Sequence, residues 1–457
     1  MAFIDNGKNK GEFLMDISVV GLGKLGACTA ACFALGKFDV LGVDINEKSV
    51  DRINNFIAPV DEPFLEDILN MANSEGHPLT ATTDHKRAIT ETDITFIIVP
   101  TPSLSDHTFS DSYIKKVFDS LIPALVQADK DYHLFVIVST IMPGTTDKLY
   151  SYVKYYSDYK LNSSKFGIVY NPEFIAIGSV IKNFLQPDIV LIGSDKIKDA
   201  NRVKKIYEQV CENKPHIALI SSLEAEIAKI ALNCFVTMKI SFANLLLNIC
   251  SSYDGSSTKI NVDNITNAIG ADKRVSLYYL KGGLGFGGPC FPRDTKSFKA
   301  YLSSLGLPSS LPEIIDELNA FQTQQIVNKI MNLSSTFFRD NIAILGLSYK
   351  AGTHIITDSP SLDIIDGLLE KNLNITVYDK FAIDNVKAIY GSKLLYASSV
   401  KECFNNSNII VVALPEEYLK KEIIECSAEK HNTILDCWRI FNKSDFKHNN
   451  YVALGAN

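Results

Sequence analysis

The fold is decided by residues 16–32, which read DISVVGLGKLGACTAAC. An apolar run leads into Gly21, Gly23 and Gly26, and small residues follow. Gly21 permits a tight turn, Gly23 lets the backbone approach a pyrophosphate, and Gly26 lets the following helix press against the strand. The N-terminus of that helix would face the anion. The stretch therefore predicts the first strand, turn and helix of an α/β domain that binds a dinucleotide.

The dinucleotide is expected to be NAD. The second expected strand, residues 39–44, ends in Asp44. A carboxylate there accepts hydrogen bonds from the ribose hydroxyls and repels a 2′-phosphate, which favours NAD over NADP. Val99-Pro100-Thr101-Pro102 ends a later strand where a loop would run beside the cofactor. The alternatives are a glycine turn in another kind of α/β protein and, for the second motif, a plain rigid turn.

Short apolar runs rich in β-branched residues alternate with amphipathic stretches through the first half of the chain. They cover residues 16–21, 39–44, 93–100, 134–140, 167–171 and 188–193. Continuous apolar strands separated by helices are typical of a parallel sheet with both faces covered. The last third repeats the pattern at residues 341–346, 374–379, 407–414 and 432–436. We therefore expect an α/β fold with two doubly wound, Rossmann-like domains.

The region between these domains is helical in pattern. From Ser221, apolar residues recur at helical spacing without Gly or Pro until Gly255, and a second helical stretch covers about 311–333. Such a long helix should bridge two domains or pack against another subunit, although a long core helix would also fit. We expect a flexible extension at 1–14, an NAD-binding domain at 15–210, a helical dimerisation region at 211–333 and a second α/β domain at 334–457.

Composition narrows the function classes. The chain has 457 residues and a formal charge of -7, and its scattered basic residues give little support for a nucleic-acid surface. Its nine cysteines form no CxxC pair, which favours reduced thiols in the cytoplasm over a disulfide or metal framework. The first residues lack an apolar signal segment, and no stretch approaches the roughly 18 apolar residues of a membrane span. We expect a cytoplasmic protein without a metal site, membrane or nucleic-acid partner.

A glycine-rich loop near the middle of the chain carries a single thiol. Residues 281–294 read KGGLGFGGPCFPRD, so Cys290 lies near Arg293 and Asp294. The glycines let backbone amides crowd a ligand. A thiol with a pKa of about 8.5 is only slightly ionised at neutral pH, so a cationic neighbour would raise its reactivity. Most cysteines are small buried hydrophobic residues, but this loop favours a nucleophile.

Together these motifs closely resemble the UDP-glucose/GDP-mannose dehydrogenase family, and most closely its UDP-glucose 6-dehydrogenase branch. The resemblance runs from about Met15 to the last strand. It rests on GLGKLG at 21–26, VPTP at 99–102, STIMPG at 139–144, NPEF at 171–174, Lys229 and Asn233 on the long helix, GFGGPCFPRD at 285–294 and SYK at 348–350. The combination and its order are highly specific.

The resemblance implies an NAD domain, a helical dimerisation region and a nucleotide-sugar domain, and a reaction with two hydride transfers at one carbon. The carbon-6 alcohol of the sugar first becomes an aldehyde-level intermediate, to which Cys290 adds. The resulting thiohemiacetal loses a second hydride and becomes a thioester, which water hydrolyses to the uronic acid. The covalent sulfur keeps the reactive aldehyde from escaping.

The same resemblance assigns the catalytic residues. Lys229 and Asn233 lie one helical turn apart and would stabilise the oxyanion. Asp294 and Thr140 would hold a water that acts as base, and Glu173 would serve thioester hydrolysis. Either carboxylate could instead cap a helix or pair with Arg293. Residues implied to bind the cofactor are Gly21, Gly23, Lys24, Leu25, Gly26, Asp44, Lys48, Pro100, Thr101, Pro102, Thr140 and Arg293. Residues implied to bind the UDP-sugar are Glu173, Phe174, Ile175, Lys229, Asn233, Arg274, Tyr279, Lys281, Gly285, Phe286, Gly287, Lys350 and Arg439.

The chain departs from the family pattern at three places. Ile177 stands where many relatives carry a second Glu, no Arg precedes Ser359-Pro360-Ser361 at Thr357, and Lys48 stands one place before the usual basic position, Ser49. UDP-glucose is the expected substrate, with GDP-mannose and UDP-N-acetylhexosamines as alternatives. Arg274 matches a residue that reaches a neighbouring subunit, so we expect a homodimer or a larger homo-oligomer.

Two other classes of protein remain open on the residues alone. A 2-hydroxyacid or 3-hydroxyacid dehydrogenase also pairs a Rossmann domain with a helix that carries Lys and Asn, but it would not need Cys290. A cofactor-binding regulator would bind NAD or a nucleotide sugar without turnover.

Overall fold

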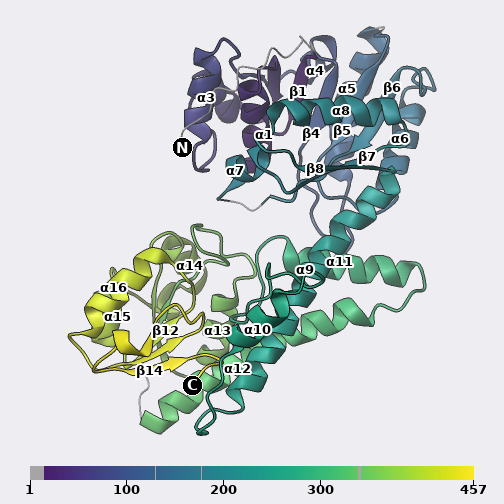
Figure 1. Cartoon of the computed structure of the whole chain (residues 1–457). Helices are drawn as coiled ribbons and strands as arrows, with labels where there is room; N and C mark the ends of the chain where they lie inside the picture. The colour runs from purple at the N-terminus through teal and green to yellow at the C-terminus, as the bar shows by residue number, and fades with distance from the viewer. Residues whose placement is uncertain (1–14, 129, 176–177, 338–340) are drawn as a thin grey trace. The chain divides into compact units, whose positions relative to one another are not determined.

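The structure, a computed structural model, describes residues 15–128, 130–175, 178–337 and 341–457. The chain divides into two compact units with the boundary between Lys229 and Ile230. Each unit contains one β-sheet with helices packed on it (Figure 1). The expectation of an α/β fold with two Rossmann-like domains is confirmed, and the expected extension at 1–14 lies outside the described residues.

The first unit is built on an eight-stranded sheet in the order β3-β2-β1-β4-β5-β6-β7-β8. Its strands are β1 (Ile17–Val20), β2 (Val40–Val43), β3 (Thr80–Thr82), β4 (Ile94–Ile97), β5 (His133–Ile137), β6 (Phe166–Tyr170), β7 (Ile189–Gly193) and β8 (His216–Ile220). Its helices are α1 (Lys24–Leu35), α2 (Glu47–Asn54), α3 (Leu65–Ser74), α4 (His85–Thr90), α5 (Ser112–Ala128), α6 (Thr145–Tyr156), α7 (Val180–Leu185) and α8 (Ile197–Val210).

Both faces of this sheet are buried, which explains the continuous apolar strands. Successive strand residues point to opposite faces. Ile94 and Phe96 of β4 join a core built with helices α1, α3, α7 and α8. Ile97 joins the core on the other face, which α4, α5 and α6 cover. The nucleotide-binding turn after β1 is thus held by a sheet that is packed from both sides.

The first sheet departs from a wholly parallel arrangement at one place. β6 and β7 pair antiparallel through Tyr170 and Gly193, whereas the other strand pairs of the sheet are parallel. A parallel crossover needs a dozen or more residues, usually in a helix that packs back along the sheet. The connection here, residues 171–188, is long enough for such a crossover, but β7 enters the sheet from the carboxyl end of β6.

The second unit has a six-stranded parallel sheet in the order β11-β10-β9-β12-β13-β14. Its strands are β9 (Asn341–Leu345), β10 (Asn374–Tyr378), β11 (Leu395–Tyr396), β12 (Ile409–Val412), β13 (Thr433–Asp436) and β14 (Asn450–Ala453). Its helices are α10 (Val262–Gly270), α11 (Phe291–Ser304), α12 (Ser310–Phe337), α13 (Pro360–Leu369), α14 (Ile383–Tyr390), α15 (Val400–Asn406) and α16 (Glu417–Ser427). One face of the sheet packs mainly on α12, α13 and α14, and the other on α15 and α16.

Helix α9 (Ser222–Ser251) is 30 residues long, in agreement with the expected long helix. By length and composition it could cross a membrane, so the expectation that no stretch is apolar enough was too strict. This is weak evidence for a membrane span, because long core helices pass the same test. The polar side chains Asn233, Thr237 and Asn244 on this helix are buried and hydrogen-bonded within the second unit.

Candidate active site

The turn after β1 needs its glycines for two different reasons. Gly21 has a φ of 96°, and a Cβ on it would lie 2.2 Å from the carbonyl oxygen of Ile98. A Cβ on Gly26 would lie 1.8 Å from the carbonyl oxygen of Gly21, so α1 can approach the turn only because this residue is glycine. Gly23, in contrast, has nothing within 4 Å of its Cβ position. It leaves open space before the N-terminus of α1, where a pyrophosphate would bind.

This difference gives a prediction for two matched substitutions. Gly26→Ala should lower the free energy of unfolding by about 1–3 kcal/mol because the methyl group has no space. Gly23→Ala should leave the thermal unfolding temperature nearly unchanged and weaken NAD binding by at least about tenfold, since the methyl group fills the space for the pyrophosphate. Calorimetric unfolding and NAD titration measure the two effects. An unchanged NAD affinity in Gly23→Ala would contradict this assignment.

Asp44 directly follows β2, close to its expected place at the end of the strand, and holds the turn. Its carboxylate accepts hydrogen bonds from the backbone nitrogens of Leu22, at 2.6 Å, and Asn46, at 2.8 Å. The second unit contains a similar carboxylate, Asp379, after β10. Asp379 is buried and accepts from four backbone nitrogens, those of residues 347, 348, 381 and 382. Asp44 is only partly buried, so its carboxylate retains accepting capacity for ribose hydroxyls.

The loops after β4 and β5 are tied together. The hydroxyl of Thr101 donates to the carbonyl oxygen of Thr140 at 2.7 Å, and Ser139 Oγ donates to the carbonyl oxygen of Val99 at 2.6 Å. The expected cofactor-binding residues Pro100 and Pro102 are exposed on this pair of loops. Lys48 is exposed on α2, and Lys24 and Leu25 are partly buried in the first turn of α1.

Glu173 lies in a largely apolar environment next to Lys229. Lys229 Nζ donates to the backbone carbonyl of Glu173 at 2.7 Å and lies 4.7 Å from the ring centroid of Phe174. The hydroxyl of Tyr207 lies 2.7 Å from Glu173 Oε1. Burial raises the pKa of Glu173 to about 7, although the Tyr207 hydrogen bond and the Lys229 charge oppose this shift. Ile175 follows and is partly buried. A carboxyl group with this pKa can exchange a proton near neutral pH.

Cys290 is exposed at the position that precedes α11. One helical turn later, Asp294 is buried, and its Oδ2 accepts a hydrogen bond from Asn233 Nδ2 at 2.6 Å. Arg293 is partly buried between them in sequence. The partial positive charge of a helix N-terminus stabilises an anion such as a thiolate. In the second unit, the loop that carries the Cys290 thiol therefore leads directly into α11, and the Asn233 amide bonds to Asp294 in the first turn of that helix.

The glycine loop before Cys290 is held by side-chain amides that sequence analysis missed. Asn244 bonds to the backbone nitrogen of Gly283 and to the carbonyl of Leu284. Gln322 donates to the carbonyl of Gly283, and Asn319 bonds to both backbone groups of Phe286. These amides come from α9 and α12, which are far from the loop in sequence. Their only signal in the sequence is a polar residue on the otherwise apolar face of a long helix.

The remaining residues expected to bind the sugar nucleotide have different surroundings. The side chain of Arg439 is only 4% exposed, forms a two-point ion pair with Asp263 at 2.9 Å, and donates to the carbonyl of Gly282 at 2.6 Å. It therefore supports the glycine loop. Gly285, Phe286 and Gly287 lie within that loop, and Lys281 is exposed at its start. Arg274 is exposed and paired with Asp272, Tyr279 is exposed with its ring 5.9 Å from that of Phe291, and Lys350 is partly buried.

The departures from the family pattern can be placed in part. Ile177 lies outside the described residues. Thr357 and Asp358 contact the glycine loop, because the backbone nitrogen of Gly288 donates to the carbonyl of Thr357 at 3.1 Å. A Cβ on Gly287 would lie 1.9 Å from the carbonyl oxygen of Asp358. The segment without the usual Arg thus packs directly on the loop through its backbone.

Two buried carboxylates, also missed from sequence, anchor loops of the first unit. Glu226 on α9 accepts from the backbone nitrogens of Gly144 and Thr146, within and after the STIMPG motif. Glu62 accepts from the backbone nitrogens of Gly178 and Val180. Burial raises the pKa of Glu226. These contacts join residues that are far apart in the chain, so no local pattern indicates them.

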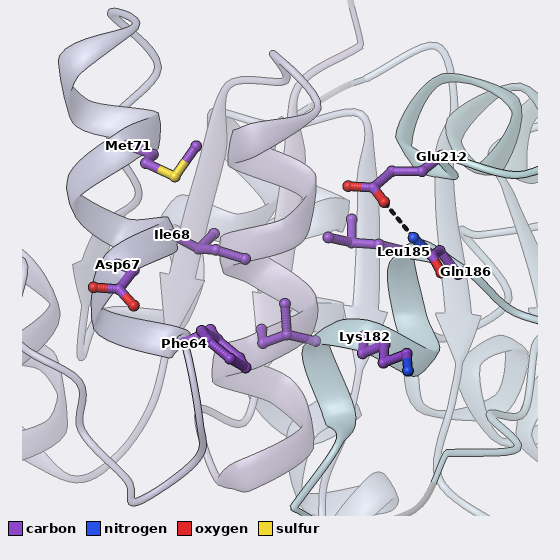
Figure 2. Close-up of a pocket in the computed structure, with 9 residues that line it drawn as sticks. Phe64, Asp67, Ile68, Met71, Lys182, Leu185, Gln186 and Glu212 are labelled. Atoms are coloured by element: carbon purple, nitrogen blue, oxygen red, sulfur yellow. Dashed lines mark hydrogen bonds between the residues drawn. The ribbon is translucent and has the colours of Figure 1, made fainter. Parts of the chain in front are cut away.

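A cavity of about 330 Å³ lies between α3 and α7 of the first unit (Figure 2). Phe64, Ile68 and Leu185 contribute apolar walls, and Gln186 donates to Glu212 at 2.7 Å at its edge. None of the residues expected to bind cofactor or substrate lines this cavity.

Comparisons with known families match the chain along most of its length. The NAD binding domain of the UDP-glucose/GDP-mannose dehydrogenase family matches residues 15–211. The central domain of that family matches residues 223–321, and its UDP binding domain matches residues 343–443.

Individual relatives agree with the family match. The UDP-glucose 6-dehydrogenase of Haloferax volcanii is 31% identical over 94% of this chain and 98% of its own. The GDP-mannose 6-dehydrogenase of Pseudomonas savastanoi is 30% identical over 88% of this chain and 92% of its own. The solved structure of a UDP-glucose dehydrogenase from Pyrobaculum islandicum is 27% identical, with a TM-score of 0.85, and covers 98% of this chain and 99% of its own.

Proposed function

Because the chain belongs to the UDP-glucose/GDP-mannose dehydrogenase family, we propose that it oxidises UDP-glucose to UDP-glucuronate with NAD. The observation that carries the proposal is the exposed thiol of Cys290 before α11, one turn from the buried Asp294–Asn233 hydrogen bond. A dehydrogenase that performs a single oxidation needs no nucleophilic thiol. The named UDP-glucose 6-dehydrogenases among the relatives support the choice of sugar.

The complete reaction transfers four electrons, as two hydrides, and releases three protons. The carbon-6 alcohol loses a hydride to NAD and a proton to a base, which gives the aldehyde level. The Cys290 sulfur forms a bond to that carbon, and the thiohemiacetal loses a second hydride to a second NAD and a second proton. Water then forms a carbon–oxygen bond, the carbon–sulfur bond breaks, and the carboxylate and a third proton leave. The thiohemiacetal keeps the half-oxidised sugar bound until the second hydride has left.

The chain's own residues have separate roles in this scheme. The open turn at Gly23 and the partly free carboxylate of Asp44 would hold NAD, which accepts the hydrides. Lys229 and Asn233 would donate to the oxyanion. Asp294 and Thr140 would position the water that accepts the first proton. Glu173, with a pKa near 7, would accept a proton from the water that hydrolyses the thioester.

The proposal is tested by counting NADH formed per sugar with a panel of UDP-glucose, GDP-mannose and UDP-N-acetylhexosamines. We expect two NADH per UDP-glucose and the uronic acid as product. If one of the other sugars yields two NADH, that sugar is the substrate in place of UDP-glucose, and the mechanism is unchanged. One NADH per molecule would indicate a simple hydroxyacid-type dehydrogenase, and binding without turnover would indicate a regulator.

We further propose that the chain forms a homodimer through helix α9. The helix exposes a series of large apolar side chains, and such patches on a folded protein indicate an interaction surface. Those that lie in the second unit are Leu232, Phe235, Phe242, Leu245 and Ile249. The central helical domain to which they belong would thus be the dimerisation region. We also place the protein in the cytoplasm and its uronic acid product in the synthesis of a surface polysaccharide.

The dimer can be tested with one double substitution. Phe235→Glu with Phe242→Glu should convert the dimer to a monomer, because two charges would be buried on each side of the interface. Light scattering coupled to size exclusion measures the mass. Tyr155→Glu, which changes an exposed aromatic residue on α6, is the control and should leave the mass unchanged. A double variant that remains a dimer would exclude α9 as the interface.

A further inference from the structure

The hydroxyl of Tyr207 lies between two oxygen atoms that compete for its proton. Tyr207 belongs to α8 and is buried. Its oxygen lies 2.7 Å from Asn171 Oδ1 and 2.7 Å from Glu173 Oε1. Asn171 and Glu173 both follow strand β6, so the three groups form a short polar chain in an apolar part of the first unit.

The orientation of the Asn171 amide is set by another contact. Asn171 is buried, and its Nδ2 donates to the carbonyl oxygen of Leu191 at 2.9 Å. Its Oδ1 therefore faces Tyr207 and can only accept a hydrogen bond. A tyrosine hydroxyl has one proton, so Tyr207 cannot donate to Asn171 and to an ionised Glu173 at the same time.

The two protonation states of Glu173 thus require different hydrogen bonds. When Glu173 is protonated, it donates to Tyr207, and Tyr207 donates to Asn171, so both contacts are satisfied. When Glu173 is ionised, Tyr207 turns to the carboxylate, and the buried Asn171 Oδ1 loses its donor. A buried acceptor without a donor costs free energy, while the bond to the carboxylate is stronger than a neutral bond.

Among the described residues, the other titratable groups around Glu173 do not supply the missing donor. Lys229 from α9 donates to the backbone carbonyl of Glu173. Cys32 from α1 and Cys211 after α8 are near enough for the Glu173 charge to raise the pKa of both thiols, which burial raises most. In the part of the chain that the structure describes, the competition for the Tyr207 proton therefore involves Tyr207, Asn171 and Glu173.

We propose that Tyr207 is a positioning residue whose hydroxyl couples the protonation of Glu173 to Asn171. The proposal rests on the proposed function of Glu173 in thioester hydrolysis. As the attacking water forms its bond to the acyl carbon and the Cys290 sulfur leaves, one proton of the water moves to Glu173. The Tyr207 hydroxyl then turns from Glu173 to Asn171. Because Asn171 receives this hydrogen bond only when Glu173 is protonated, it stabilises the protonated form of Glu173. Asn171 thereby raises the pH that is needed to ionise Glu173, the form that acts as the base.

The test is a double-mutant cycle on the pKa of Glu173. Asn171→Leu should lower this pKa, because Tyr207 no longer gives up a bond when it turns to the carboxylate. The expected change is about tenfold in proton affinity. In the Tyr207→Phe background the same Asn171→Leu substitution should have no effect. A titration of the carboxyl ¹³C resonance of Glu173, in protein without substrate, measures the pKa in each variant.

The control is Tyr132→Phe, which removes another tyrosine hydroxyl of the first unit that donates to a buried carboxylate, Asp199, at 2.5 Å. It should leave the effect of Asn171→Leu intact. Equal shifts with and without Tyr207, or no shift in either, would overturn the proposal. If Asn171→Leu does not fold, the ring Cζ resonance of Tyr207 in the wild-type protein should titrate together with Glu173. A Tyr207 resonance that does not follow Glu173 would equally overturn it.

The two proposals fail separately. If the coupling is present and no sugar is oxidised, the proposed function is wrong and the hydrogen-bond switch remains. If UDP-glucose yields two NADH and the coupling is absent, the switch is wrong and the function remains. In an active enzyme with the coupling, Asn171→Leu should move the acidic limb of thioester hydrolysis to lower pH.

Discussion

Replacement of Cys290 by alanine is expected to abolish the second oxidation. Without the sulfur no thiohemiacetal forms, so the aldehyde-level sugar has no covalent link to the enzyme and no thioester can be made. Formation of UDP-glucuronate should fall by at least about 10³-fold, as for removal of a nucleophile in other enzymes. The NADH formed per sugar should fall from two to one or less. Stopped-flow absorbance of NADH and chromatographic analysis of the sugar products measure both quantities.

The matched control is Cys426→Ala, which removes a partly exposed thiol on α16 of the same unit. It should change neither the stoichiometry nor the rate. NAD binding should persist in Cys290→Ala, because the thiol is not among the residues expected to hold the cofactor. Two NADH per sugar at the normal rate in Cys290→Ala would rule out covalent catalysis by this residue.

Replacement of Lys229 by methionine should lower kcat by about 10²–10³-fold, which is the usual effect of removing one oxyanion donor. The lysine is buried, and its Nζ bonds to the backbone of Glu173. The loss of its charge also removes one influence that lowers the pKa of Glu173, so that pKa should rise above about 7 in the variant. The pH dependence of kcat should accordingly shift to higher pH.

Lys196→Met is the control for this substitution. Lys196 Nζ also donates to backbone carbonyls of the first unit, those of Ser163 and Phe166. Its loss should reduce stability by a comparable amount and leave kcat within a few-fold of the wild-type value. A similar loss of kcat in both variants would mean that Lys229 acts only through folding.

Much of the fold can be predicted from the sequence because its signals are local. The glycine turn at 21–26, the apolar strands and the unbroken helix α9 each depend on residues close in the chain. The strands that sequence analysis missed, β3, β8, β11 and β14, are short or lie toward sheet edges and carry fewer buried residues. The antiparallel pairing of β7 with β6, in contrast, is not indicated by any local pattern of residues in the sequence.

Residues of the candidate site could be predicted from the sequence only where they belong to a short sequence motif. Cys290 and Asp294 stand in one short motif, and the structure joins Asp294 to Asn233 through a direct hydrogen bond. The supporting contacts join distant residues, such as Glu226 with Thr146 and Arg439 with Asp263. Arg439 is expected to bind the substrate, and in the structure its donors bond to Asp263, the glycine loop and the carbonyl of Leu454. Pairs of this kind follow from tertiary packing, which one sequence does not reveal.

The most direct test of the covalent mechanism is mass spectrometry of enzyme quenched in acid during turnover of UDP-glucose. The Glu173→Gln variant, in which hydrolysis should be slow, is the suitable form. We expect an acyl adduct with the mass of the oxidised UDP-sugar on the peptide that contains Cys290. Two NADH per sugar with no adduct on that peptide would contradict the mechanism.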